Sequence, residues 1–322
     1  MEYNRLQFRT WSMLGKRGTF GSVLTERAPS NDNLMAISAD FGRSSGLARY
    51  SELFPEKYLN VGIAEQNLIG VSSGLASEGY NVFATSFASF ITTRSYEMVK
   101  IHCGYMQHNI KVVGLAAGFG VQLQGNTHYG LDDICLMRSI PNMTIISPAD
   151  STEVVKATEA LLDFKGPVYL RLCGEANDPM VYSADYEFEI GKAITLQEGT
   201  DVTIVATGTM VYQSLQAAKK LAGLGVECTV INMHTINPID NVTINKYCHD
   251  CKLVVTVEEG FISGGLGAAV LEEMAASSKP MTKVLNIGLT QFPHPGSYKY
   301  LLAQTGLDAE HIAEKIIAKL AT

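Results

Sequence analysis

The chain has 322 residues, of which 46% are hydrophobic and 18% charged, a composition typical of a folded globular protein. This length exceeds what one hydrophobic core usually supports, so two domains are expected. The net charge is −7 without long runs of either sign, which argues against a nucleic acid or an anionic membrane surface as a partner. The amino-terminal residues lack the apolar core of a signal peptide, and no apolar run approaches the roughly 20 residues that span a bilayer, so we expect a cytoplasmic protein.

Six cysteines are spread through a chain that is large enough to fold without disulfides, so reduced thiols are expected. The spacing of Cys248 and Cys251, with His249 between them, is suggestive of a metal site. A zinc site normally needs four such ligands, and the sequence offers no second pair. We therefore expect a structural role for these residues and no metal site in this chain.

In chain order, the first half alternates strand and helix signals. Apolar runs predict buried strands at 34–40, 81–87, 110–118 and 168–172. Helices are expected from about 62 to Gly79, through Tyr96 and Val99, and from a cap at Asp150 or Ser151 to the Gly-Pro pair at 166–167. Residues 173–191 lose this periodicity and predict a linker.

The second half repeats the alternation. Strands are expected at 201–208, 226–233 and 252–260, helices after 209 and after the GGLG run at 264–267, and a turn in HTINPID at 234–240. Repeated strand–helix units imply an α/β fold with two doubly wound domains and mostly parallel sheets. We expect the domains to cover residues 1–180 and 181–322.

Glu65 lies just inside the start of a predicted helix, where Gly62 and Ala64 would allow a planar ligand to approach closely. A carboxylate that complements the helix dipole is the simple structural explanation. The run GIAEQN, however, resembles transketolases and the related deoxyxylulose-phosphate synthases. In that family, a glutamate at this point faces the aminopyrimidine ring of thiamine diphosphate. The chemistry requires a protonated carboxyl beside a ring nitrogen, and burial favours the neutral form.

The resemblance extends over nearly the entire chain. The run TSFASF is similar to the family's pattern around an aromatic residue that stacks on the pyrimidine, which implies that Phe87 and Phe90 bind the cofactor. Taken alone, their spacing also fits a pair of core residues. The run SADFGRSS resembles the family's strand and loop and implies that Phe41 lies near the cofactor and Ser44 near the substrate.

The resemblance also implies substrate contacts. GNTH places His128 where the family has a histidine beside the sugar hydroxyls, as a hydrogen-bond donor or proton shuttle. Arg17 matches an arginine that contacts the substrate phosphate, and its simple alternative is a solvated surface charge. An acidic family residue that senses an acceptor hydroxyl aligns with Gln124. Two phosphate contacts of the family are missing, because Ala116 and Gly174 stand in their places.

The family's first domain binds the cofactor diphosphate through Mg²⁺, or another divalent ion, with a GDG…NN motif, and no GDG occurs in these 322 residues. The resemblance therefore implies a separate N-terminal transketolase subunit that carries this site, with self-association through both domains, in an α2β2 assembly. HTINPID and VEEGFISGGLG resemble the family's C-terminal domain, which carries no known catalytic group.

The function implied is the thiamine diphosphate-dependent transfer of a two-carbon ketol unit from a ketose to an aldose, acting on sugars or sugar phosphates. The missing phosphate contacts leave a non-standard ketose open. Three alternatives remain: the β subunit of a 2-oxo acid dehydrogenase, a deoxyxylulose-phosphate synthase-like enzyme, and a non-catalytic scaffold. The joint presence of Glu65, Phe87 and Phe90 argues against the scaffold.

Overall fold

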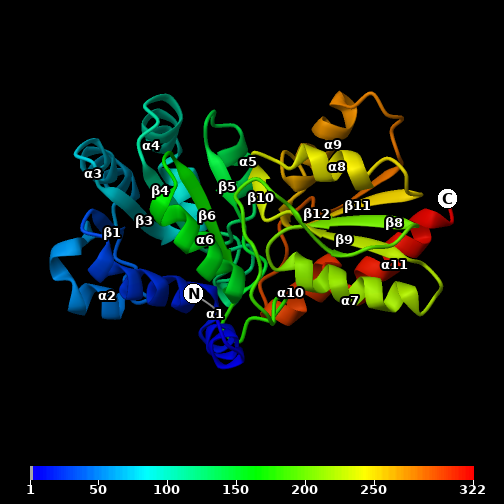
Figure 1. Cartoon of the computed structure of the whole chain (residues 1–322), viewed down its shortest axis with the longest axis horizontal. Helices are drawn as coiled ribbons and strands as arrows, with labels where there is room; N and C mark the ends of the chain where they lie inside the picture. The colour runs from blue at the N-terminus through cyan, green and yellow to red at the C-terminus, as the bar shows by residue number, and fades with distance from the viewer. Residues whose placement is uncertain (1–2) are drawn as a thin grey trace.

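The computed structural model describes residues 3–322, which form two sheets with helices on both faces (Figure 1). The first sheet has seven strands in the order β10-β5-β6-β4-β3-β1-β2. Their bounds are β1 (Leu34–Ser38), β2 (Tyr58–Asn60), β3 (Asn81–Phe87), β4 (Ile110–Ala117), β5 (Thr144–Ile146), β6 (Val168–Cys173) and β10 (Thr235–Asn237). All neighbours pair in parallel except β10, which runs antiparallel to β5.

The second sheet has five strands in the order β12-β11-β8-β9-β7. Its strands are β7 (Ile194–Gln197), β8 (Val202–Ala206), β9 (Cys228–Asn232), β11 (Leu253–Phe261) and β12 (Val284–Leu289). Only the edge strand β7 is antiparallel to its neighbour. The expected α/β class with two mostly parallel sheets is therefore confirmed.

Helices cover both faces of each sheet. In the first half they are α1 (Arg5–Arg27), α2 (Ala48–Leu53), α3 (Glu65–Ser77), α4 (Tyr96–Val99), α5 (Asp133–Arg138) and α6 (Ser151–Asp163). In the second half they are α7 (Met210–Ala222), α8 (Asn241–Tyr247), α9 (Leu266–Ala276), α10 (Tyr298–Thr305) and α11 (Ala309–Leu320). In Figure 1, α8 and α9 lie above the second sheet, while α7 and α11 lie below it.

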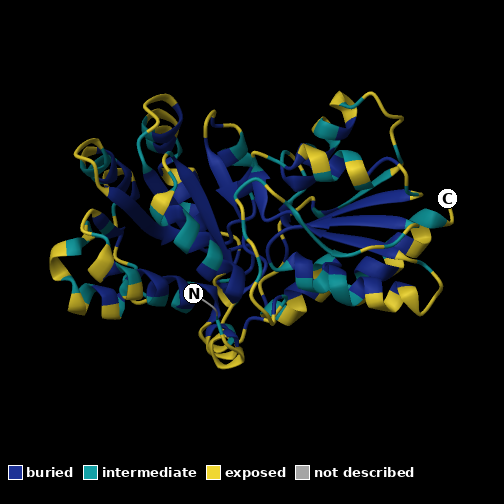
Figure 2. Ribbon diagram, in the orientation of Figure 1, coloured by how far each residue is buried: buried dark blue, intermediate teal, exposed yellow. Residues whose placement is uncertain are grey.

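The apolar runs of the sequence explain why these strands form the core. Every residue of β3, β4 and β6 is buried, as expected for parallel strands that are covered on both faces. Figure 2 shows the same contrast, with dark strands inside and exposed residues on the outer turns of the helices. Helix α6 begins as expected, because the side chain of Asp150 accepts a hydrogen bond from the Glu153 N–H at 2.9 Å.

Several elements were not expected from the sequence, among them β5, β12 and α11, and two further differences have a clear physical reason. HTINPID was expected to be a turn, but residues 235–237 form β10, which pairs Thr235 with Ile146 in the first sheet. Helix α1 was not predicted, since its glycines weaken a helical signal. Gly15 kinks this helix at φ 70°, and a side chain there would lie 2.7 Å from the carbonyl oxygen of Glu175.

The six thiols are free in the described structure, including Cys248 and Cys251. Residues 3–322 form no cluster of three or more His, Cys, Asp or Glu side chains suited to a metal ion. None of the helices in the same residues has the length and apolar character needed to cross a membrane.

Candidate active site

The expected cofactor-binding residues and His128 gather at the carboxyl edge of the first sheet. β1, β3 and β4 are parallel, and the pairings Ser38 with Thr85 and Phe87 with Leu115 bring their carboxyl ends together. The loops that follow these strands, and the start of α3 after β2, therefore meet at one edge. Ligands of doubly wound sheets bind at this edge.

Glu65 is the first residue of α3 and is 1% exposed. At this position its carboxylate complements the positive end of the helix dipole, which is the simple structural role considered for Glu65 from the sequence. Its Oε2 accepts a hydrogen bond from Arg94 Nη1 at 2.7 Å, whereas Oε1 has a long 3.5 Å contact with the hydroxyl of Ser86. Oε1 therefore has the capacity to accept or share a stronger hydrogen bond with a ligand.

Arg94 differs from the apolar surroundings that were expected for Glu65. It ends a π-helical segment, Phe90–Arg94, and its carbonyl oxygen accepts a hydrogen bond from Gln66 Nε2 at 3.2 Å. Its side chain is 50% exposed, and its guanidinium lies 4.6 Å from the centre of the Phe90 ring. Arg94 occupies only Oε2, so Oε1 of Glu65 stays open to a ligand while the ion pair is kept.

Three phenylalanines form an aromatic cluster beside this pair. The ring centres of Phe41 and Phe87 are 4.3 Å apart, and those of Phe87 and Phe90 are 5.9 Å apart. The ring of His128 meets Phe90 edge-on at 5.2 Å. The last residue of β3 and the segments that follow β1, β3 and β4 thus bring all four rings together.

Arg17 and Ser44 form a second group. Arg17 Nη1 donates to the carbonyl oxygen of Ser44 at 3.4 Å, and burial lowers the pKa of Arg17 below its ordinary value. Among residues 3–322, no carboxylate pairs with this guanidinium. A cavity of about 380 Å³ lies between α1 and the linker, and its lining includes Arg17, Arg43, Ser44, Gly174 and Glu175.

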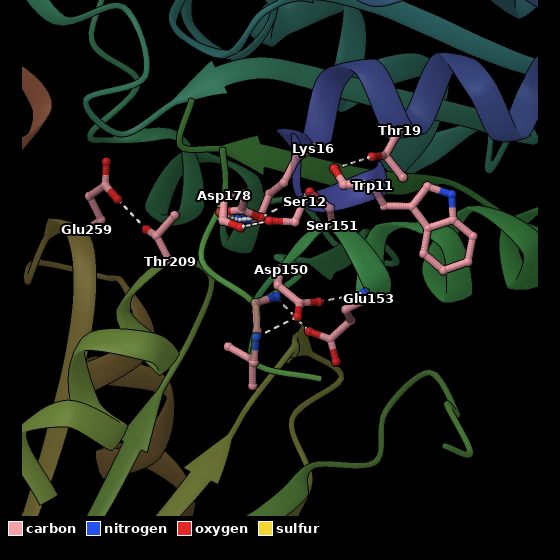
Figure 3. A network of polar contacts seen from close by, with 12 residues as sticks. Trp11, Ser12, Lys16, Thr19, Asp150, Ser151, Glu153, Asp178, Thr209 and Glu259 are labelled. Atoms are coloured by element: carbon pink, nitrogen blue, oxygen red, sulfur yellow. Dashed lines mark hydrogen bonds and ion pairs between the residues drawn. The ribbon is translucent and has the colours of Figure 1, made fainter. Parts of the chain in front are cut away.

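A buried ion pair holds the wall of this cavity. Lys16 Nζ lies 2.8 and 2.9 Å from the two carboxylate oxygens of Asp178, and both residues are buried (Figure 3). Ser151 adds a hydrogen bond of 3.2 Å to the same carboxylate. The pair joins α1 to the linker, and both segments line the cavity that contains Arg17 and Gly174.

Gln124 lies apart from the other expected residues. It is exposed at the end of a short 3₁₀ turn, Gln122–Gln124. In the part of the chain that the structure describes, its side chain makes no hydrogen bond to another expected site residue. His128, from the same loop, has its Nδ1 atom 2.9 Å from the hydroxyl of Thr127.

Sequence reasoning missed Arg43 and Arg94. Arg94 is the one basic residue in the run FITTRSY, seven positions after Phe87, and this isolated charge was a signal that could have been used. Arg43 stands one position before Ser44 and could have been considered with it.

Comparisons with known proteins identify the family of the chain. Residues 13–176 match the family model described as transketolase, pyrimidine binding domain, and residues 191–312 match transketolase, C-terminal domain. The chain therefore belongs to the transketolase family and corresponds to the part that contains these two domains.

Relatives of similar length support the same assignment. The chain is 38% identical to a putative transketolase C-terminal section from Methanocaldococcus jannaschii, covering 95% of this chain and 96% of the relative. It is 36% identical to one of the subunits of the apulose-4-phosphate transketolase of Phocaeicola vulgatus, covering 94% and 96%. A solved split-gene transketolase, described as an inactive β4 tetramer, has a TM-score of 0.85 at 34% identity and covers 95% of this chain and 98% of its own.

Proposed function

We propose that this chain, with an N-terminal partner chain, transfers a two-carbon ketol unit from a ketose to an aldose with thiamine diphosphate as cofactor. One observation carries the proposal: a buried carboxyl lies beside an aromatic cluster. Glu65 is 1% exposed, and Arg94 contacts both its carboxylate, at 2.7 Å, and the ring of Phe90, at 4.6 Å. The similarity to transketolase subunits and sections supports this function.

The residues present fit the aminopyrimidine ring of the cofactor. Phenylalanine rings offer flat apolar faces for stacking, and Oε1 of Glu65 has only the 3.5 Å contact with Ser86 among the described residues. When bound, thiamine diphosphate supplies a nucleophilic ring carbon for the ketose carbonyl and an electron sink for carbon–carbon cleavage.

The residues of this chain would then bind the ring, hold a proton and contact the sugar. Phe41, Phe87 and Phe90 hold the ring in place, and Glu65 holds a proton on a carboxyl oxygen that faces the ring nitrogen. Arg94 donates to Oε2, so it can keep this hydrogen bond while Oε1 holds the proton. His128, whose ring lies 5.2 Å from that of Phe90, donates hydrogen bonds to hydroxyls of the sugar.

The far end of the sugar is proposed to lie in the cavity beside Arg17, with Ser44 at its wall. Gln124 could contact the substrate only from its exposed turn. Arginine is well suited to a phosphate or another anion. Glu175 lines the same cavity and Gly174 offers no side chain, which weakens the site for a doubly charged phosphate. We therefore propose a ketose other than the standard pentose phosphates as the preferred donor.

The partner is proposed to hold the diphosphate and Mg²⁺, since the sequence contains no GDG motif. The proposed assembly is α2β2, the domain division falls near residue 180, and the location is cytoplasmic. Free thiols, as described for all six cysteines, are typical of proteins from reducing compartments.

Reconstitution tests the function. The chain is mixed with an N-terminal subunit that carries GDG…NN, thiamine diphosphate and Mg²⁺, and the release of an aldose from a panel of ketoses is measured. Ketol transfer is expected in the mixture and in neither chain alone. Turnover of pyruvate with an aldehyde phosphate instead would indicate a synthase, and acyl transfer to a lipoyl domain would indicate a dehydrogenase subunit. Tight binding of the cofactor by this chain alone would contradict the proposed division of the site.

A further inference from the structure

Two neighbouring glutamates near the end of β11 serve different parts of the molecule. Glu258 and Glu259 are each 1% exposed, and successive side chains of a strand point to opposite faces. Glu258 accepts hydrogen bonds from the N–H groups of Leu266 and Gly267, each at 2.9 Å, and so caps α9. The side chain of Glu259, in contrast, contacts Phe119 in the first half of the chain.

The carboxylate of Glu259 accepts three hydrogen bonds. Oε1 accepts from the backbone N–H of Phe119 at 2.6 Å, and Oε2 accepts from the hydroxyl of Tyr298 at 2.6 Å. The hydroxyl of Thr209 also donates to Oε2, as Figure 3 shows. Hydrogen bonds to a charged acceptor are short and strong. Glu259 therefore ties the backbone just after β4 to two residues of the second half.

The backbone at this point is unusual. Ala116 has φ 50° and Gly118 has φ 63°, so two residues within three positions lie in the left-handed region. A Cβ atom on Gly118 would lie 2.1 Å from Oε1 of Glu259, so the carboxylate fills the space that a side chain would need. Such conformations persist where the surroundings hold them, and they are common at active sites.

The segment that begins at Gly118 ends at Gly130, which is linked to Glu259 through Arg171. The N–H of Gly118 donates to the carbonyl oxygen of Gly130 at 2.8 Å, which closes residues 118–130 into a loop. Arg171 Nη2 donates to this carbonyl at 3.2 Å and to the carbonyl oxygen of Glu259 at 2.8 Å. His128 stands two residues before this closure, so the position of its ring depends on how the base of the loop is held.

We propose that Glu259 is a positioning residue for the ketol transfer: its carboxylate fixes the 118–130 loop and thereby holds His128 against the aromatic cluster. This inference rests on the proposed function. It assigns a role in the reaction to the C-terminal domain, whose motifs had suggested no catalytic contribution.

The test uses variants in the reconstituted complex. Glu259→Met removes every acceptor at similar length, and Glu259→Gln keeps one oxygen that can still accept from Phe119 while the two hydroxyls turn. Glu258→Met is the matched control, because it removes the neighbouring buried carboxylate that caps α9. Hydrogen exchange of peptides that cover 118–130, the Kd for thiamine diphosphate and kcat/KM for the ketose are measured for each.

Glu259→Met is expected to speed exchange in the 118–130 loop at least tenfold and to lower kcat/KM at least tenfold, with the cofactor Kd unchanged within twofold. Glu259→Gln should recover most of the loss, and Glu258→Met should leave the loop exchange unchanged. In a His128→Ala background, Glu259→Met should cost less than a further twofold. If Glu259→Met fails to fold, Glu259→Asp replaces it, because its carboxylate is one methylene too short to reach both Phe119 and Tyr298.

Unchanged exchange in the 118–130 loop of the folded variant would overturn the inference. Losses that multiply in the double variant would overturn it as well, since Glu259 would then act independently of His128. If the wild-type complex shows no ketol transfer at all, the proposed function fails. The exchange experiment on this chain still decides whether Glu259 holds the loop.

Discussion

Removing the charge of Asp178 should strongly destabilise the first half of the chain. Asp178 pairs with Lys16 at 2.8 Å, and the two side chains are 3% and 1% exposed. Asp178→Asn keeps the shape of the side chain and one acceptor oxygen. The ammonium of Lys16 would then remain buried without its counterion.

Breaking a buried ion pair from one side costs about 3–5 kcal/mol. The remaining asparagine oxygen can still accept one hydrogen bond, so we expect the lower end, about 3 kcal/mol. The exposed pair Lys220–Glu310, with side chains 47% and 60% exposed, is the matched comparison. Glu310→Gln should cost no more than about 1 kcal/mol, because solvent screens such pairs.

Urea unfolding followed by fluorescence measures the difference. The chain has one tryptophan, Trp11, which lies on the same helix as Lys16 and is 7% exposed, so it reports on this half of the molecule. With a slope of about 3 kcal/mol per molar, the midpoint should fall by roughly 1 M. Replacing both residues, as in Lys16→Met with Asp178→Leu, should recover much of the loss. A shift for Asp178→Asn no larger than that for Glu310→Gln would refute the reasoning.

Three further predictions follow from the structure. Burial lowers the pKa of His234 from 6.5 to about 4, so the folded state favours the neutral imidazole. The free energy of unfolding should therefore fall by about 3 kcal/mol as the pH drops from about 6.5 to 4. His234→Gln should flatten this part of a profile of urea midpoint against pH. Phe87→Leu should weaken the binding of thiamine diphosphate to the complex roughly 3- to 10-fold, because aromatic stacking contributes about 0.5–1.5 kcal/mol. Calorimetry measures this affinity, and Phe83→Leu on the same strand should leave it unchanged. Arg94→Gln should lower the melting temperature of the chain alone more than that of the cofactor-loaded complex, where the cofactor would give Glu65 another partner; equal losses would contradict this.

Much of the fold could be predicted because local patterns and tertiary structure agree. The runs in β3 and β4 are continuously apolar, as buried parallel strands require, and Gly79 marks the end of α3. Strand β10 was missed because three residues form a strand only through pairing with β5, about 90 positions earlier in the chain. A local pattern contains no information on such a partner.

In the candidate site, too, some residues could be identified from the sequence and others could not. Glu65 and Phe87 could be singled out only because GIAEQN and TSFASF resemble the transketolase family. In the structure, Glu65 begins α3 and Phe87 ends β3, at the edge where ligands of doubly wound sheets bind. Arg94 was missed because π-helical turns alter the side-chain direction that ordinary helical spacing predicts. The contact of Glu259 with Phe119 joins residues 140 positions apart, so only the folded chain reveals it.

The central claim is that Glu65 activates the cofactor, and Glu65→Gln in the reconstituted complex tests it most directly. The amide has the same shape and its oxygen can still accept from Arg94, so assembly and cofactor affinity should stay within a few-fold of wild type. Ketol transfer should fall at least about 100-fold, the contribution expected of a positioned proton-transfer group. Glu78→Gln, at the other end of α3, should behave like wild type. Turnover of Glu65→Gln within about threefold of wild type would contradict the account.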